Sequence, residues 1–358
     1  GLQEVGKNCY CLEKNDDLII VDCGVKFVNN NNLADGTIPN FTYLQENRKK
    51  IKGLFLTHAH EDHVGGIPYL LQVLPQIPVY GSEFSISYLK QKLGVRDNRD
   101  KQFRTVIFGD DTVVRTEEFR VSFFRVTHSI PGSFGLIVEV LADNSRIVLT
   151  GDFKFDLTAI GEETDLAKLA EAGKKGVDLL LSESTNAEIP GNTPSEVKVV
   201  QRLESLITEA TVEKDDTIVL TSSPIMDNRL NVEVISNKLF ALGAKIYENN
   251  KQDLLHASGH ACQEDLKLML KLVNPTYLMP IHGDFRMLKE HSYLAEEVGI
   301  PSPNVFVCEN GEVVEAKGKE FFLAGEKIAS QSNYVFNDQL VLADELNHNL
   351  FLREKMAH

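Results

Sequence analysis

The sequence predicts an α/β protein, and three observations carry that prediction. Short apolar segments with the two-residue alternation of strands dominate the first half of the chain, as at Phe119, Val121 and Phe123. In the second half, apolar strand-like runs alternate with segments of helical periodicity, as in α/β units. The composition is globular, with 42% apolar and 25% charged residues in 358, enough for one large domain or two ordinary ones.

Strands are expected in the first half wherever an apolar run meets a turn signal. The run Leu18 to Val21 stops at Asp22, and a hairpin is expected to turn at Asp143–Asn144, a favoured turn pair. Thr193, one residue before Pro194, is expected to cap a helix. The remaining first-half expectations are strands within 51–56, 112–118 and 119–128 and helices over 68–73, 165–174 and 194–208.

The second half is expected to alternate between strands and helices. Beyond about Gly318 the pattern weakens, and the polar segment 347–358 is expected to be loosely held. The expected elements are strands over 217–223, 244–248 and 276–283 and helices over 228–242, 263–273 and 286–298.

Charge, cysteine content and apolar run length restrict the function classes. The net charge of −15 argues against nucleic-acid binding by bulk attraction, but a nuclease that holds a phosphodiester through metal ions remains compatible with it. Five cysteines without regular spacing favour reduced thiols and a cytoplasmic protein. No apolar run approaches the ~20 residues of a membrane span, and no secretory signal is recognisable, so no membrane partner is expected.

The segment T-H-A-H-E-D-H at residues 57–63 predicts a metal site. Three histidines at this spacing have no packing rationale, and imidazole and carboxylate groups suit a borderline-soft cation. Strand alternation would direct His58 and His60 to one ion, while Asp62 and His63 on the following turn would reach a second ion.

Three more ligand-type residues follow apolar strands in the same way. His128 ends FFRVTH, Asp152 ends IVLTGD and His282 ends YLMPIH. Because loops gather at strand ends, these side chains are expected to converge with the first four. A carboxylate such as Asp152 can bridge two cations about 3.5–4 Å apart.

These motifs resemble the metallo-β-lactamase superfamily and, more closely, its ribonuclease J branch of β-CASP nucleases. His58-Ala59-His60-Glu61-Asp62-His63 is similar to the superfamily signature H-x-H-x-D-H, and the resemblance implies the αββα sandwich fold. Further similarity to the ribonuclease J branch, spread over most of residues 2–316, lies in EVGKN (4–8), GIPYLL (66–71), ESTNAEIPGNTPSE (183–196), SSP (222–224), HASGHA (256–261) and PIHGD (280–284).

The resemblance implies a role for each matching residue. One ion would be bound by His58, His60 and His128, the other by Asp62, His63 and His282, with Asp152 bridging. Catalysis would involve Asp62, Asp152 and His260, with His260 contacting the scissile phosphate or protonating the leaving group. Glu183 matches the first acidic β-CASP motif, and Asp22 fits a carboxylate that orients a ligand. Ser184, Ser258 and His260 are candidates for holding a phosphate, although small turn residues account equally well for the two serines.

The chain departs from the family in one segment. Relatives carry a long β-CASP module between the helix after ESTNAE and the strand of DTIVLTSSP, whereas here VEKDDTIVL follows that helix almost at once. A deletion and an omitted segment would both produce this pattern. The expected division is a metallo-β-lactamase core over 1–194 and 257–320, a remnant of the β-CASP insertion over 195–256 and a C-terminal tail over 321–358.

The sequence therefore predicts a metal-dependent RNA phosphodiester hydrolase acting as a 5′-exonuclease or endonuclease. Two Zn²⁺ ions, with Mn²⁺ as the alternative, would activate water for attack on phosphorus, and His260 would assist departure of the 3′-oxygen. The expected partners are single-stranded RNA with a 5′-monophosphate and a second copy of the chain in a dimer or higher oligomer. The alternatives are a metallo-hydrolase of small esters and a metal-stabilised subunit without catalytic activity.

Overall fold

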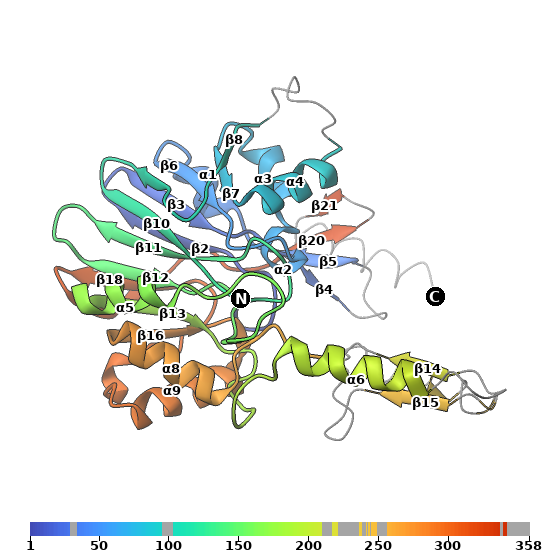
Figure 1. The fold of residues 1–358 in the computed structure, drawn as a ribbon. Helices are drawn as coiled ribbons and strands as arrows, with labels where there is room; N and C mark the ends of the chain where they lie inside the picture. Colours follow the sequence, from blue (N-terminus) through green and yellow to red (C-terminus); the bar gives the residue numbers. More distant parts are fainter. Residues whose placement is uncertain are drawn as a thin grey trace, which may run out of the picture.

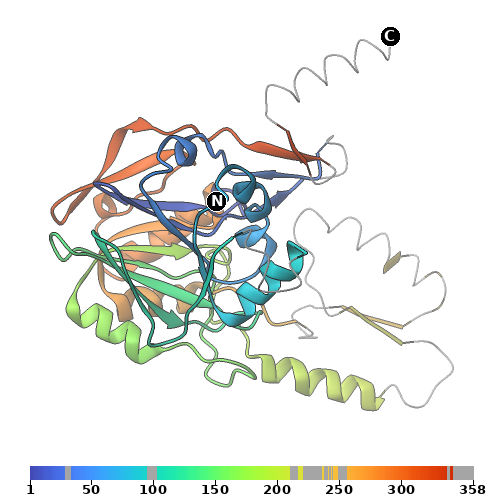
Figure 2. The same ribbon diagram turned by 90° about the horizontal axis from the view of Figure 1, so that it is seen from above.

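In a computed structural model, the chain forms four layers in the order helix, sheet, sheet, helix (Figures 1 and 2). This confirms the predicted αββα sandwich. The structure describes residues 1–28, 34–94, 103–209, 217–220, 236–237, 241, 243, 245–248, 256–336 and 339–341. The predicted helix over 228–242, the SSP motif and the polar chain end lie almost wholly outside these ranges.

The first sheet has five strands and carries three helices on its outer face. The helices pack on it through a core that includes Leu54, Leu70 and Leu89, all fully buried. In spatial order the strands are β2 (Tyr10–Lys14), β3 (Asp17–Val21), β6 (Ile51–Phe55), β7 (Val79–Gly81) and β8 (Thr105–Ile107), and the helices are α1 (Thr42–Glu46), α3 (Ile67–Val73) and α4 (Glu83–Lys92).

The second sheet has six strands and is covered by three helices on the opposite outer face. Leu169, Leu270 and Leu294, one from each helix, are buried against it. In spatial order the strands are β16 (Pro275–Ile281), β13 (Val177–Glu183), β12 (Arg146–Leu149), β11 (Phe134–Val140), β10 (Phe119–Arg125) and β9 (Val113–Arg115), and the helices are α5 (Leu166–Lys175), α8 (Gln263–Val273) and α9 (Phe285–Glu297).

The two sheets enclose a third core between them. Phe119, Val121 and Phe123, the residues with predicted alternation, all point into it and are buried. Phe55 from the first sheet packs on Phe123 with ring centroids 6.2 Å apart. The two-residue pattern in the sequence is therefore the inward face of β10.

The segment after Gly318 contains strands that the sequence did not predict. β19 (Glu320–Lys327) pairs with β18 (Glu312–Lys317), and β20 (Asn333–Phe336) pairs with both β21 (Gln339–Val341) and β5 (Gly36–Ile38). Residues within the expected tail thus pair with strands that precede it in the chain. The other short elements are β1 (Leu2–Gln3), β4 (Lys26–Phe27), β17 (Gly283–Asp284), α2 (Glu61–Val64) and the 3₁₀ turn η3 (Ser302–Asn304).

Helix α6 (Glu196–Glu209) leaves the sandwich and extends away from it (Figure 1), and β14 (Thr217–Leu220) and β15 (Lys245–Glu248) form a parallel pair. These three elements are called the outlying segment below. The expected cap at Thr193 is wrong, because the helix begins three residues later. The Thr193 hydroxyl instead donates to the His260 carbonyl at 2.7 Å.

The direction of the strands determines where in the fold the predicted ligands lie. β10, β12, β13 and β16 run the same way, because β10 and β12 are each antiparallel to β11 while β12, β13 and β16 are mutually parallel neighbours. β3 and β6 are likewise parallel in the other sheet. The carboxyl ends of these strands therefore meet at one edge of the sandwich, where the predicted ligands follow them.

Candidate metal centre

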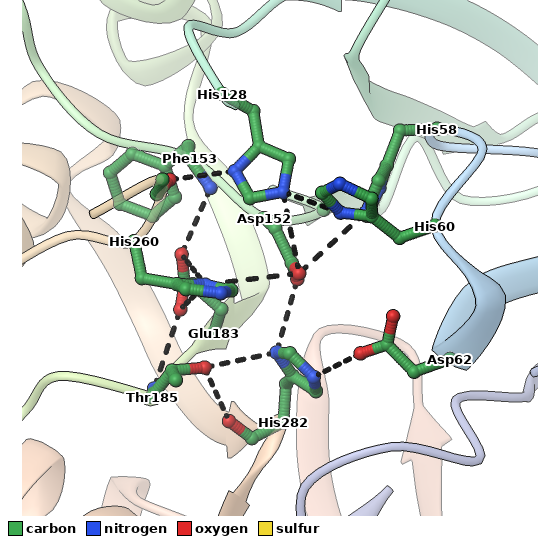
Figure 3. A network of polar contacts seen from close by, with 12 residues as sticks. His58, His60, Asp62, His128, Asp152, Phe153, Glu183, Thr185, His260 and His282 are labelled. Atoms are coloured by element: carbon green, nitrogen blue, oxygen red, sulfur yellow. Dashed lines mark hydrogen bonds and ion pairs between the residues drawn. The ribbon is translucent and has the colours of Figure 1, made fainter. Parts of the chain in front are cut away.

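Three histidines form the first half of the site. His60 Nδ1 lies 3.1 Å from His58 Nε2 and 3.0 Å from His128 Nε2 (Figure 3). His58 and His128 are buried and His60 is half-buried. The predicted convergence is present, but its expected cause is wrong: β6 ends at Phe55, so His58 and His60 extend from a loop rather than from one strand face.

Two carboxylates and two histidines form the second half. His282 Nε2 lies 3.0 Å from Asp62 Oδ2, and His63 Nε2 lies 3.7 Å from the same oxygen. His63 Nε2 is also 3.2 Å from Asp152 Oδ2. Asp62 and His63 are presented by the short helix α2, which directly follows the first two histidines. Each of these four side chains can place a ligand atom within 4.8 Å of the others.

Asp152 lies between the two halves. Its Oδ2 is 3.7 Å from His58 Nε2 and 3.9 Å from His128 Nε2, in addition to its contact with His63. This oxygen is buried and has no hydrogen-bond partner among the described residues. An unsatisfied buried carboxylate oxygen surrounded by imidazole nitrogens fits a bridge between two cations. The separations of 3.1 and 3.0 Å from His60 Nδ1 to the other two nitrogens are also close to the ~3.3 Å spacing of tetrahedral zinc ligands.

Hydrogen bonds on the far side of each ring select the nitrogen that is left for an ion. His128 Nδ1 donates to the Gly259 carbonyl at 2.7 Å, which leaves Nε2 with its lone pair. His63 Nδ1 lies 2.8 Å from Asp22 Oδ2. The Thr57 backbone and hydroxyl donate to the two oxygens of Asp22 at 2.8 and 2.7 Å. Asp22 thus lies between Thr57 and His63, where a carboxylate can fix the orientation of the His63 ring.

The charge state of the site suits divalent cations. Burial lowers the pKa of His58 well below its usual value and that of His128 to about 3, so both rings are neutral with a free lone pair. Burial acts in the same direction on His63, but the Asp152, Asp62 and Asp22 carboxylates outweigh it and raise the pKa of His63 well above normal. Burial raises and the neighbouring His282 and His63 lower the pKa of Asp152, with a net result well below normal. One half thus supplies neutral nitrogens, while the carboxylates of the other favour a proton on His63 that a bound cation would displace.

His260 and Glu183 form a pair beside the ligand cluster. His260 Nδ1 lies 3.1 and 3.0 Å from the two Glu183 oxygens, and the Phe153 backbone donates to Glu183 Oε1 at 2.9 Å (Figure 3). Burial lowers the pKa of His260, but the Glu183 charge outweighs it and raises the pKa to about 9. The pairing with Glu183 therefore favours the protonated form of His260 near neutral pH.

The two candidate phosphate-binding serines are held by protein groups. Ser184 is fully buried, with Oγ 3.0 Å from His291 Nδ1 on helix α9. Ser258 Oγ accepts hydrogen bonds from the His260 backbone at 3.1 Å and from Asn186 Nδ2 at 2.9 Å. Contact with a phosphate would require Ser184 to exchange its partner, whereas Ser258 also shapes the turn that carries His260.

Several groups that contact and position the candidate ligands were not predicted from the sequence. Asn8 is fully buried, and its Nδ2 lies 3.0 Å from His63 Nε2. Thr185 Oγ1 lies 3.1 Å from His282 Nδ1. The Gly259 carbonyl has no side-chain signal at all. Asn8 lies in EVGKN and Thr185 in ESTNAE, so the motifs contained the signal that could have identified these two residues.

Comparison with known protein families gives two matches, which together contain all seven candidate metal ligands. Residues 2–178 match the metallo-beta-lactamase superfamily, and residues 248–306 match the Zn-dependent metallo-hydrolase RNA specificity domain. Among solved structures, a protein of unknown function from Enterococcus faecalis V583 is similar with a TM-score of 0.57 at 16% identity, covering 90% of this chain and 98% of that one. Unliganded yeast PDE1 is similar with a TM-score of 0.50 at 15% identity, over 85% and 93% of the two chains. These structures support the fold.

Curated relatives are considerably more similar in sequence. Ribonuclease J of Mycoplasma genitalium is 32% identical over 434 aligned residues, which cover 94% of this chain and 76% of the relative. Ribonuclease J2 of Bacillus subtilis is 31% identical, over 92% and 76% of the two chains. The aligned stretch of 434 residues exceeds the 358 of this chain, so the relative carries residues within it that are missing here. With both domain matches in order and identity sustained over nearly its full length, the chain belongs to the ribonuclease J family of the metallo-β-lactamase superfamily.

Proposed function

We propose that this chain is a metal-dependent RNA phosphodiester hydrolase. The observation that carries the proposal is the His260–Glu183 pair directly beside the seven-residue ligand cluster: His260 Nδ1 lies 3.8 Å from Asp152 Oδ2 and 3.0 Å from Glu183 Oε2. A protonated imidazole at the edge of a two-metal site has the chemistry needed to cleave a phosphodiester. The similarity to ribonuclease J supports RNA as the substrate.

Seven side chains would hold two divalent cations. The donor chemistry favours Zn²⁺, with Mn²⁺ as the alternative. When bound, such ions supply Lewis acidity toward phosphate oxygens and lower the pKa of water. One ion would be held by His58, His60 and His128 and the other by Asp62, His63 and His282, with Asp152 shared.

Residues of the chain itself would donate the proton to the leaving group and hold the neighbouring rings in position. His260 holds a proton at neutral pH and would deliver it to the departing 3′-oxygen, leaving a 5′-phosphate on the other product. Glu183 keeps the His260 ring in position and maintains its positive charge. Asp22, through Thr57 and His63, fixes one ring of the second ion's ligand set.

The substrate would be single-stranded RNA, with a preference for a 5′-monophosphate. The match of residues 248–306 to an RNA specificity domain supports an RNA contact near the His260 loop. We assign residues 1–194 and 257–320 to the hydrolase core, and 195–256 to a shortened β-CASP insertion. We further propose a cytoplasmic location and a dimer or larger assembly. No helix in the described part of the chain has the length and apolar character to cross a bilayer.

The first experiment incubates the purified chain with 5′-monophosphorylated single-stranded RNA, beside an Asp152→Ala variant and metal analysis of both. Cleavage that disappears in the variant, with about two metal equivalents in the parent, is the expected result. Full metal loading without cleavage would refute the nuclease proposal. A parallel assay with a 5′-hydroxyl RNA tests the monophosphate preference.

A second variant separates the nuclease from a hydrolase of small esters. His260→Gln removes the proton donor but leaves all seven candidate ligands in place. We expect RNA cleavage to fall by two to four orders of magnitude, in line with the usual contribution of a general acid. Unchanged RNA cleavage in His260→Gln would remove this residue from the reaction.

A further inference from the structure

A lysine lies buried beside the metal centre, where a free charge would be costly. Lys154 is fully buried, one of the largest side chains in this state. Lysine is almost never fully buried unless its ammonium group is paired. It comes two residues after Asp152, and its ammonium group, which has only donors, cannot bind a cation while it is charged. The groups that pair with the ammonium group therefore indicate the role of Lys154.

The ammonium group of Lys154 pairs with two carboxylates. Nζ lies 3.0 Å from Glu196 Oε1 and 3.7 Å from Asp156 Oδ2. Asp156 in turn accepts hydrogen bonds from the backbone of Glu196 and of Thr158, both at 3.0 Å. We call Lys154, Asp156 and Glu196 the Lys154 triad; the first two side chains are buried and that of Glu196 is 29% exposed.

The triad connects to the outlying segment. Glu196 is the first residue of helix α6, which carries this segment away from the sandwich (Figures 1 and 2). A further contact at 2.7 Å joins Thr158 Oγ1 to the hydroxyl of Ser195, directly before the helix. The start of α6 is thus held by side chains of the loop that follows Asp152.

The same loop connects to the metal centre. The Lys154 backbone donates to the Thr127 carbonyl at 2.9 Å, directly before His128. The preceding residue, Phe153, donates to Glu183 Oε1, the partner of His260. Of three consecutive residues, Asp152 is therefore the candidate bridge, Phe153 contacts Glu183 of the His260 pair, and Lys154 contacts Glu196 at the start of α6.

We propose that the Lys154 triad couples helix α6 to the metal centre, so that the position of the outlying segment controls cleavage of RNA. Lys154 is then a positioning residue, because it acts through its neighbours rather than on the substrate. This inference rests on the proposed RNA hydrolase function. Its specific consequence is that RNA, which extends beyond the metal ions, depends on the triad, whereas a small phosphodiester does not.

The principal variant is Glu196→Gln, which removes the charge but retains an oxygen acceptor for Lys154. Lys154→Met is the second variant, with folding checked by circular dichroism because it leaves two carboxylates without their cation. Glu171→Gln is the matched control: it removes a carboxylate from an exposed pair with Lys175, 2.6 Å long, on helix α5. Each protein is assayed on 5′-monophosphorylated RNA and on bis-(p-nitrophenyl) phosphate, with metal equivalents determined.

We expect kcat/KM for RNA to fall at least five-fold in Glu196→Gln and further in Lys154→Met. In Glu196→Gln, hydrolysis of the small diester and the metal content should stay within two-fold of the parent, as both substrates should in Glu171→Gln. Equal losses on both substrates would overturn the proposal, because the triad would then only support the metal centre. Unchanged RNA cleavage in both variants would overturn it as well.

Amide hydrogen exchange provides a readout that does not depend on RNA cleavage. Coupling predicts faster exchange in Glu196→Gln at the start of α6 and also at Lys154, whose amide bonds to Thr127. Faster exchange confined to α6 would contradict coupling. If the parent binds metal but cleaves no RNA, the proposed function fails, and the exchange pattern alone then decides whether α6 and the centre are coupled.

Discussion

At the scale of single residues, two glycines lie so close to residues of the candidate metal site that no side chain would fit in their place. A Cβ at Gly259 would lie 2.7 Å from His128 Cε1, and a Cβ at Gly24 would lie 1.6 Å from the Asp62 carbonyl oxygen. Each glycine serves a different half of the centre. Two other residues adopt the left-handed region usually left to glycine: Asp22 with φ of 59° and His282 with φ of 52°. Such strain persists where the surrounding structure fixes the residue.

Gly259→Ala should weaken binding of the ion proposed to be held by His58, His60 and His128. The new methyl group displaces the His128 ring and stretches its bond to the Gly259 carbonyl, so affinity should fall about 10- to 100-fold, as for other losses of ligand support. Competition titration with a chromophoric chelator measures this change. Gly161→Ala, where a Cβ meets nothing within 4 Å, is the control. Parent-like affinity in Gly259→Ala would show that the ring adjusts freely.

Gly24→Ala should affect the other ion. The collision lies on the backbone of Asp62, which is the N-terminal part of helix α2 and cannot move without shifting Asp62 and His63 together. We expect about one metal equivalent instead of two, measured by elemental analysis after dialysis. Loss of both ions, or of neither, would contradict the assignment of ligands to two separable halves.

At the scale of elements, the sequence predicted those parts of the fold that local patterns encode. The hairpin turn at Asp143–Asn144 is present between β11 and β12, with Asn144 at φ of 56°. The helices expected near 68–73, 165–174, 263–273 and 286–298 correspond to α3, α5, α8 and α9. All seven predicted ligands gather at one edge because each follows a strand or turn that local patterns reveal.

The remaining elements depend on partners distant in sequence. β20 pairs with β5, so that Tyr334 lies opposite Thr37, and neither segment has a strong strand pattern of its own. Ser184 resembled a phosphate contact because its neighbours match a catalytic motif, yet its partner His291 belongs to a helix more than a hundred residues away. The Gly259 carbonyl carries no signal, because every residue has a backbone oxygen. Non-local pairing and backbone acceptors cannot be found from local composition.

Asp284 belongs to a motif next to the candidate site, but its side chain stabilises a helix. It lies in PIHGD, two residues after His282, but its side chain accepts the Met287 amide at 2.9 Å and caps helix α9. Asp284→Ala should therefore lower the free energy of unfolding by about 1 kcal/mol, as for other lost caps. Asp284→Asn should restore stability, since Asn caps equally well. Urea denaturation measures both, and a loss of metal in Asp284→Asn would point instead to a direct role at the site.

At the scale of the whole molecule, the candidate ligands come from both sheets. His58, His60, Asp62 and His63 follow β6 of the five-stranded sheet, whereas His128, Asp152 and His282 follow β10, β12 and β16 of the six-stranded sheet. The proposed ions would join the sheets at the edge where both end. Without cations, the buried Oδ2 of Asp152 would have only imidazole nitrogens as neighbours, the nearest being His63 Nε2 at 3.2 Å, and no ion would link the two sheets.

Removal of metal should therefore lower the melting temperature of the entire core rather than only loosen a loop. An ion present at a thousand times its Kd stabilises by about 4 kcal/mol, so chelation should reduce Tm by roughly 5–10 °C in a chain of this size. Differential scanning calorimetry before and after EDTA treatment measures the shift, and restored Zn²⁺ should reverse it. Asp152→Ala is the control and should respond much less to EDTA, because its bridge is gone. An equal shift in the parent and in Asp152→Ala would place the stabilising ion elsewhere and remove the proposed link between the sheets.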